Sequence, residues 1–454
     1  MGEYDLIVIG AGMAGLNAVD RAVGEGRRIA VIERSLIGGT CPTRGCIPSK
    51  ALIRAAEIAH QSRRAAEFGI HTGEVRVDFA AVMERVRAII QKGSDGTRRW
   101  VESLDGVEIV EGDATVTGPN SVLVDGRELS AARIVVATGA APWVPPIPGL
   151  DQVPHWTSDD LLLRVNDLPS RLLIVGAGPI ALELGQAMRR LGSAVTMVEV
   201  APTLLPRSEP ELVEMLRARL AEEGVEIHVG ATIHEVRPGP ELVVTIDGQT
   251  RTLSADALLV AAGRGPAIEG LGLEQTAVEA DRRGVQVDDY LATAEPTVYA
   301  AGDVVGLPYG AFTHVARRMG IWAVDNALGL DPHVASTDVG PTAIFTDPEL
   351  AAIGLTEAEA RAAGHDVLVG TTGFGGGRAR AVGEEYGRVK VVIERGTRRL
   401  LGAHVLAYHA ADLVNTLAVA MSAPGASVDP IIDAFHIHPT MGEVIQSVIK
   451  GTAG

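Results

Sequence analysis

The sequence has few cysteines and few aromatic residues. Only two of its 454 residues are cysteine, and aromatic residues make up 4% of the chain. This scarcity excludes a scaffold stapled by disulfides and fits a reducing cytoplasm, where a disulfide is more often catalytic than structural. The apolar runs are too short or too interrupted to span a membrane. An apolar strand is expected from Asp5 onward, so we expect no signal peptide.

Runs of positive charge are also missing from the sequence. The net charge is −17 and is spread along the chain. We therefore expect neither nucleic acid nor a membrane surface as a partner. The length is enough for about three domains with packed cores.

Both cysteines stand in one short stretch, residues 38–50. Cys41 and Cys46 are close enough in sequence to form a small disulfide ring if the loop between them bends. A helix is predicted to follow, with Pro48 at its first position, where a missing N–H costs nothing. The positive end of that helix favours a thiolate at its start. The pattern alone fits a redox-cycling dithiol, a static disulfide or two inert core cysteines.

The first forty residues carry a dinucleotide fingerprint. A buried strand at residues 5–9 leads into a turn with Gly10, Gly12 and Gly15, then a helix, a second strand at residues 29–32 and Glu33. The glycines allow backbone N–H groups and a helix N-terminus to reach a pyrophosphate. The acid accepts hydrogen bonds from ribose hydroxyls.

The same pattern returns near residue 172. A strand precedes Gly176, Gly178 and Ala181, and a second strand at residues 194–198 ends at Glu199, with the same glycine-to-acid spacing as before. Two such units predict two bound nucleotides.

The other elements follow from periodicity and turn residues. We expect mostly helix over residues 49–90, interrupted near 68–70 and 75–77, short strands over 107–124, and a linker at 142–148. A strand over residues 297–303 ends at Asp303. From residue 340 onward, strands at 389–393 and 400–405 with helices at 357–363 and 410–422 predict a sheet without a nucleotide fingerprint.

Together these motifs resemble the FAD-dependent pyridine nucleotide-disulfide oxidoreductases over nearly the whole chain. The resemblance implies an α/β fold with two Rossmann-like domains, for FAD and NAD(P), and a C-terminal α+β dimerisation domain. The implied divisions are residues 1–148 and 271–335 for FAD, 149–270 for NAD(P), and 336–454 for the interface. The implied FAD contacts are Gly10, Gly12, Gly15, Glu33, Arg34, Gly39, Thr40, Lys50, Ala114, Ala137, Thr138, Gly139, Asp303 and Thr313. The implied NAD(P) contacts are Gly176, Gly178, Ala181, Glu199 and Gly263.

The resemblance also implies catalytic roles. Cys41 would exchange with substrate, and Cys46 would exchange electrons with the flavin. Lys50 would pair with Glu183 beside the flavin, although both could be ordinary surface charges. His438, oriented by Glu443, would be the acid/base and would serve the partner subunit of a homodimer.

Among the branches of the family, dihydrolipoamide dehydrogenases fit best. The sequence carries no cysteine near residue 454 and has His438 where mercuric reductases have tyrosine. Glu199 would repel the 2′-phosphate of NADPH, so NADH is favoured, with Arg207 as the competing signal. The spacer Pro42-Thr43-Arg44 departs from that branch, as do Asp412 and Ala267.

The expected partners are a lipoamide-like dithiol or disulfide and, through it, a lipoyl-domain protein or dehydrogenase complex. The alternatives are another NAD(P)H-dependent disulfide reductase (mercuric, glutathione or mycothione reductase-like), a quinone reductase, or a non-catalytic FAD module. A quinone reductase or a non-catalytic module would not need the cysteines.

Overall fold

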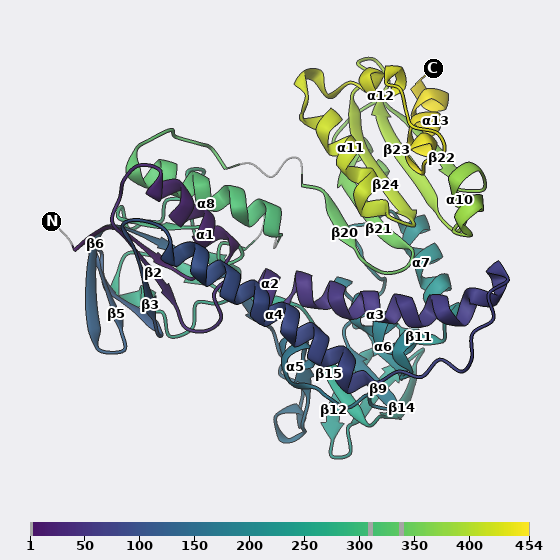
Figure 1. The fold of residues 1–454 in the computed structure, drawn as a ribbon, viewed down its shortest axis with the longest axis horizontal. Coiled ribbons are helices and arrows are strands. Elements are labelled where there is room, and N and C mark those ends of the chain that lie inside the picture. Colours follow the sequence, from purple (N-terminus) through teal and green to yellow (C-terminus); the bar gives the residue numbers. More distant parts are fainter. Residues whose placement is uncertain (1–2, 307–311, 336–339, 454) are drawn as a thin grey trace.

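The apolar strands around the first glycine turn pair in parallel at the centre of a seven-stranded sheet (Figure 1). The structure is a computed structural model that describes residues 3–306, 312–335 and 340–453. In this first sheet the order is β3-β2-β1-β6-β5-β4, and β19 pairs with β6. Its strands are β1 (Tyr4–Ile9), β2 (Ile29–Glu33), β3 (Val107–Glu111), β4 (Ala114–Gly118), β5 (Ser121–Val124), β6 (Arg127–Val136) and β19 (Val298–Ala300).

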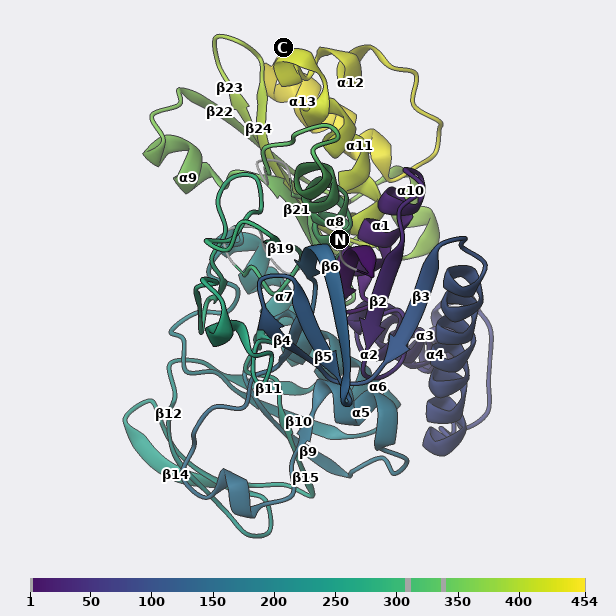
Figure 2. The ribbon, with the colours of Figure 1, turned by 90° about the vertical axis from the view of Figure 1, so that its left-hand side faces the viewer.

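Two helices distant in sequence cover this sheet together. These are α1 (Met13–Val23), which follows the glycine turn, and α8 (Thr313–Leu328), which lies beside it in both ribbon views (Figures 1 and 2). Their backbones approach so closely that a Cβ on Gly320 would lie 2.0 Å from the carbonyl oxygen of Ala14. The first unit is therefore completed by residues far beyond the second fingerprint.

The second fingerprint builds a five-stranded sheet with the order β11-β10-β9-β15-β8, all parallel. The helices around it include α6, which begins at Pro179 directly after the glycine turn. A three-stranded antiparallel sheet, which the sequence reading did not predict, packs beside it. The elements are β8 (Trp156–Thr157), α5 (Ser158–Arg164), β9 (Arg171–Val175), α6 (Pro179–Leu191), β10 (Ala194–Val198), α7 (Pro210–Glu222), β11 (Val225–His228), β12 (Thr232–Arg237), β13 (Glu241–Ile246), β14 (Gln249–Ser254) and β15 (Ala257–Val260).

Two short strands join the two units. β7 (Ala140–Pro142) and β16 (Arg264–Pro266) pair antiparallel, so the chain enters and leaves the second unit side by side. The predicted linker at residues 142–148 therefore begins as a paired strand.

The C-terminal region forms an antiparallel sheet with the order β20-β21-β24-β23-β22, with helices around it (Figure 1). The predicted α/β fold with a third, α+β region is thus confirmed. Its elements are β20 (Thr342–Ile344), β21 (Glu349–Gly354), α9 (Glu357–Ala362), β22 (Val367–Gly373), α10 (Gly377–Val382), β23 (Arg388–Glu394), β24 (Leu400–Ala407), α11 (Ala410–Ser422), α12 (Asp429–Asp433) and α13 (Gly442–Ala453).

A buried lysine joins this sheet to the second unit. Lys390 Nζ on β23 lies 2.9 Å from Glu209 Oε2 at the start of α7 and 2.9 Å from Glu357 Oε2 on α9. Glu209 also accepts the backbone N–H of Glu357 at 2.7 Å. We call these residues the Lys390 cluster.

The helical region after the cysteines differs from its prediction. It forms α2 (Thr40–Arg44), α3 (Cys46–Arg64) and α4 (Phe79–Glu102), which extends well past residue 90. The buried positions Val86, Ile90 and Ser94 continue the helical period, although Gly93 and Gly96 resemble a break. Asp78 caps α4 by accepting the N–H of Ala81 at 3.0 Å.

The remaining elements are short. They are η1 (Ala65–Phe68), η2 (Leu150–Gln152), η3 (Leu273–Gln275), η4 (Pro424–Ala426), β17 (Ala280–Asp281) and β18 (Gly284–Val285). Among the helices of the described ranges, none has the length and apolarity needed to cross a membrane.

Candidate active site

A deep cleft opens at the carboxyl ends of β1 and β2, where the N-terminus of α1 points into it. At Gly10, whose φ is +106°, a Cβ would lie 2.4 Å from the carbonyl oxygen of Ala137, so only glycine allows this approach. Most of the predicted FAD contacts line the cleft: Gly10, Gly12, Glu33, Arg34, Gly39, Thr40, Lys50, Ala137, Thr138, Gly139, Asp303 and Thr313. Ala114 lines an adjoining pocket with Glu33. Gly15 lies outside both and instead allows α1 to pack against the turn.

The polar groups of the cleft fit a large hydroxylated, anionic cofactor. Glu33 is held by the N–H groups of Ala11 and Ser35, at 3.0 and 2.9 Å. Thr138 Oγ1 is buried and has no hydrogen-bond partner among the described residues. Burial raises the pKa of the Asp303 carboxyl, and the charge of Arg264 offsets part of this rise. The glycine turn and the α1 N-terminus suit a pyrophosphate, so the cleft fits FAD.

Arg264 is a cleft residue that the sequence reading missed. Its guanidinium donates to the carbonyl of Ala140 at 2.6 Å and pairs with Asp159 at 3.0 Å. It stands at the start of β16, four residues after the end of β15. Its contacts tie the cleft to α5 of the second unit.

Both cysteines line this cleft. Cys41 lies in α2 and Cys46 is the first residue of α3, so the helix begins two residues before the predicted position at Pro48. The cause is Gly45, whose φ of −138° and ψ of −110° end one helix before the next begins. The structure has both as thiols.

The surroundings of the two thiols shift their pKa values in opposite directions. A hydrogen bond from Cys41, with further help from Thr313 and the charge of Lys50, outweighs burial and lowers the pKa of Cys46 to about 6. The bond to Cys46 and burial raise the pKa of Cys41. Thr313 Oγ1 lies 3.5 Å from Cys46 Sγ. These opposite shifts in pKa favour the thiolate of the reduced pair on Cys46 over Cys41.

Lys50 lies one helical turn after Cys46 and meets a carboxylate from the second unit. Its Nζ is 2.8 Å from Glu183 Oε2, and the side chain of Glu183 is only 9% exposed. The backbone N–H of Phe345 donates to the other oxygen of Glu183 at 2.9 Å. The structure thus brings together residues from the cysteine helix, α6 and the C-terminal region.

A second pocket lies at the carboxyl ends of β9 and β10. Gly176, Gly178, Glu199 and Gly263 line it, and no arginine or lysine of the described chain does. Glu199 accepts the N–H groups of Ala177 and Ala201, each at 2.8 Å, as Glu33 does with its own turn. Ala181 is fully buried and does not line the pocket. Arg207 is exposed and lies outside it.

The two pockets share one turn of helix. Pro179 and Ile180, at the start of α6, line both of them. Ligands bound in the two pockets would therefore be separated by this turn of helix.

His438 and Glu443 form a pair far from the cysteines of their own chain. His438 Nδ1 lies 2.9 Å from Glu443 Oε1, and the His438 side chain is 77% exposed. Hydrogen bonds from the Thr440 N–H and from His438 lower the pKa of Glu443. The segment between α12 and α13 lies at the end of the C-terminal region remote from α2 (Figures 1 and 2). His436 instead contacts the carbonyl of Ile431.

Two nucleotide pockets that share a wall, with a dithiol and an ion pair in one of them, define a nucleotide-dependent dithiol–disulfide oxidoreductase. Comparison with known proteins agrees with this class. The pyridine nucleotide-disulphide oxidoreductase family matches residues 4–320, and the dimerisation domain of that family matches residues 340–449. The chain belongs to this family of flavin-dependent enzymes, which use FAD and a pyridine nucleotide.

Individual relatives carry different names. A mercuric reductase of Bacillus cereus is 35% identical, over 98% of this chain and 71% of its own length. A dihydrolipoyl dehydrogenase of Chlorobaculum tepidum is also 35% identical, over 98% of this chain and 96% of its own. Among solved structures, the HOCl-induced flavoprotein disulfide reductase RclA from Escherichia coli has a TM-score of 0.88 at 28% identity, covering 98% of this chain and 99% of that one.

Proposed function

We propose that this protein is an NADH-linked disulfide oxidoreductase of the dihydrolipoyl dehydrogenase type, which acts on lipoamide or a related small dithiol. The observation that carries this proposal is the complete redox set in one cleft: the Cys41–Cys46 pair with opposite shifts in pKa, and the Lys50–Glu183 ion pair beside it. FAD, when bound in the cleft, supplies two-electron transfer between this pair and a nicotinamide.

The thiol acidities give each sulfur a role. A substrate thiolate attacks Cys41 of the oxidised pair, forms a mixed disulfide, and releases Cys46, whose low pKa makes it the better leaving group. The second substrate thiolate then attacks the substrate sulfur of that bond. The substrate becomes a disulfide, and Cys41 leaves with two electrons retained on the protein pair. Because the pKa of Cys41 is raised, it needs a proton as it leaves.

We assign the donation of that proton to His438. It also takes protons from the substrate thiols, while Glu443 holds the imidazole through Nδ1. Because His438 is exposed and remote from α2 in its own chain, we place it at Cys41 of the partner subunit in a C2 homodimer. The exposed Phe435 and Ile437 beside it are apolar and suit a contact between subunits.

The remaining assignments belong to the same proposal. Glu199 lines a pocket that no described arginine or lysine lines, which supports NADH over NADPH. Residues 1–148 and 271–335 form the FAD-binding unit, residues 149–270 the NAD-binding unit, and residues 336–454 the interface domain. The enzyme works in the cytoplasm, with a lipoyl-domain protein of a dehydrogenase complex as its partner.

The test compares electron donors and acceptors with the purified holoenzyme. NADH oxidation is measured with lipoamide, glutathione disulfide, a quinone and Hg²⁺, and each reaction is repeated with NADPH. We expect lipoamide to be the preferred acceptor and NADH to exceed NADPH about 10–100-fold in kcat/KM, because a 2′-phosphate would lie against Glu199. Faster turnover of Hg²⁺ or a quinone, with lipoamide inert, would refute the substrate assignment. Equal rates with NADPH would refute the nucleotide assignment.

A further inference from the structure

Helix α6 presents three buried polar side chains on one face. Glu183, Gln186 and Arg190 are spaced three and four residues apart, and all three are buried. Burial of such groups is unfavourable unless each finds a partner. All three find partners in one short segment of the C-terminal region, residues 345–347, between β20 and β21.

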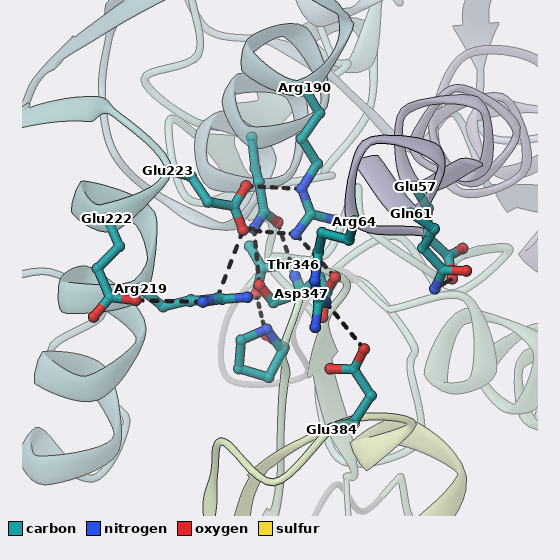
Figure 3. A network of polar contacts seen from close by, with 12 residues as sticks. Glu57, Gln61, Arg64, Arg190, Arg219, Glu222, Glu223, Thr346, Asp347 and Glu384 are labelled. Carbon is teal, nitrogen blue, oxygen red and sulfur yellow. Dashed lines mark hydrogen bonds and ion pairs between the residues drawn. The ribbon is translucent and has the colours of Figure 1, made fainter. Parts of the chain in front are cut away.

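Asp347, at the end of this segment, is held through both its backbone and its side chain. The Gln186 amide donates to the carbonyl of Asp347 and accepts its N–H, both at 2.8 Å. The Asp347 carboxylate pairs with Arg190 at 2.9 Å, and Arg190 pairs at 2.6 Å with Glu223, the residue directly after α7 (Figure 3). The side chains of Arg190 and Glu223 are only 5% and 8% exposed, whereas that of Asp347 is 27% exposed.

Phe345, two residues earlier, contacts both members of the redox-site ion pair. Its N–H donates to Glu183 Oε1 at 2.9 Å, while Lys50 Nζ lies 4.2 Å from the centre of its ring. A cation over an aromatic face is attracted to it, and the attraction is directional. The ring and the carboxylate therefore hold the ammonium group from two sides.

We propose that Phe345 is a positioning residue of the redox site, and that Gln186 and Arg190 act by holding residues 345–347 against α6. Phe345 holds Lys50 at one position relative to the dithiol, one helical turn from Cys46. The inference rests on the proposed function, because it concerns the Lys50 charge beside the redox pair. The C-terminal region thus shapes the redox site of its own chain, separately from any service by His438 to a partner.

The test measures the pKa of Cys46, which depends on the position of the charged Lys50 side chain. Among the residues that the structure describes, Cys41 and Lys50 are the titratable or charged side chains that shift the pKa of Cys46. Reduced holoenzyme is alkylated with iodoacetamide between pH 5 and 9 and then digested with trypsin. Cleavage after Arg44 separates the two cysteines into different peptides, so mass spectrometry follows each thiol by itself.

Phe345→Leu removes the ring and keeps the backbone N–H. We expect the alkylation profile of Cys46 to move to higher pH, with a rate at pH 6 reduced about threefold or more, because a freer Lys50 stabilises the thiolate less. Gln186→Met, which loses both bonds to Asp347, should move the profile in the same direction. Phe345→Tyr keeps the ring face and should keep the wild-type profile.

Glu384→Gln is the matched control. It breaks the Arg64–Glu384 ion pair at 3.2 Å, on the far side of the same network from α6 (Figure 3). It should lower thermal stability without moving the Cys46 profile. An unchanged profile in a folded Phe345→Leu or Gln186→Met protein would overturn the inference, as would an equal shift in Glu384→Gln. The alkylation profile is measured without substrate. If the enzyme fails to turn over lipoamide but the profiles shift as expected, the proposed function is refuted and this inference stands.

Discussion

The Lys390 cluster gives a quantitative test of how the C-terminal sheet is attached. The side chain of Lys390 is 8% exposed and that of Glu209 4%. A further carboxylate, Glu211, lies 3.6 Å from Lys390 Nζ, and the side chains of Glu357 and Glu211 are 31% and 38% exposed. Burial alone would lower the pKa of Lys390, but the hydrogen bonds to Glu209 and Glu357 outweigh it and raise that pKa. The cluster therefore holds a charged lysine that compensates at least one fully buried carboxylate.

Lys390→Met keeps the length of the side chain and removes its charge. Breaking a buried ion pair costs about 3–5 kcal/mol because the remaining charge has no partner. We take the lower end, about 3 kcal/mol, because water reaches the two more exposed carboxylates. This corresponds to a fall in Tm of about 6–12 °C for a unit of 150–250 residues.

The assay is scanning calorimetry of the holoenzyme at fixed FAD concentration. Lys450→Met, the same substitution at an exposed position of α13, is the control and should change Tm little. Adding Glu209→Gln to Lys390→Met should restore part of the loss, because it removes the uncompensated charge. A Lys390→Met protein that melts within about 2 °C of the Lys450→Met control would refute this account of the cluster.

Three further outcomes follow from the site. In the reduced protein, alkylation of Cys46 should stay fast down to about pH 6 and slow below it, because its lowered pKa keeps the thiolate present above that pH; a profile centred near 8.5 would contradict this. Asp303→Leu should weaken FAD binding about 10–100-fold in titrations of apoprotein by flavin fluorescence, since a hydrogen bond to a charged group is lost; Asp303→Asn should weaken it less, and equal losses would argue against a hydrogen-bonding role. Mixing inactive Cys41→Ser and His438→Ala proteins with subunit exchange should restore roughly a quarter of wild-type activity per site, because each hybrid dimer then has one intact site. If exchange is demonstrated and no activity returns, His438 acts within its own chain.

The sequence predicted best what short stretches determine. The glycine turns with Glu33 and Glu199 depend on residues within one strand-helix-strand unit, and both turns form the expected pockets. The structure also places Lys50 against Glu183, which the family resemblance had paired. The helix after the cysteines was predicted less well, because Gly93 and Gly96 lower the local helix signal while packing of α4 maintains the helix.

Other features depend on contacts that no local pattern contains. Gln186 resembles any polar residue of an amphipathic helix until Asp347, from another sheet, lies against it. Phe345 in the sequence resembles the end of a strand, yet its N–H and its ring contact two charged residues. These cases share a cause: the partner lies in a different unit of the chain.

The paired strands β7 and β16 also bear on the order in which the chain folds during synthesis. They mark the second nucleotide unit as an insertion in the first, whose sheet lacks β19 until residues 298–300 emerge. At about 5–20 residues per second, the ribosome needs roughly 8–30 s to proceed from the end of β6 to β19. Strands β8 to β15 are all synthesised within that interval, so we expect the inserted unit to complete its sheet first. On this reasoning the unit that begins the chain is the later of the two to complete its sheet, and α8 can pack against α1 only after residues 313–328 have also been synthesised.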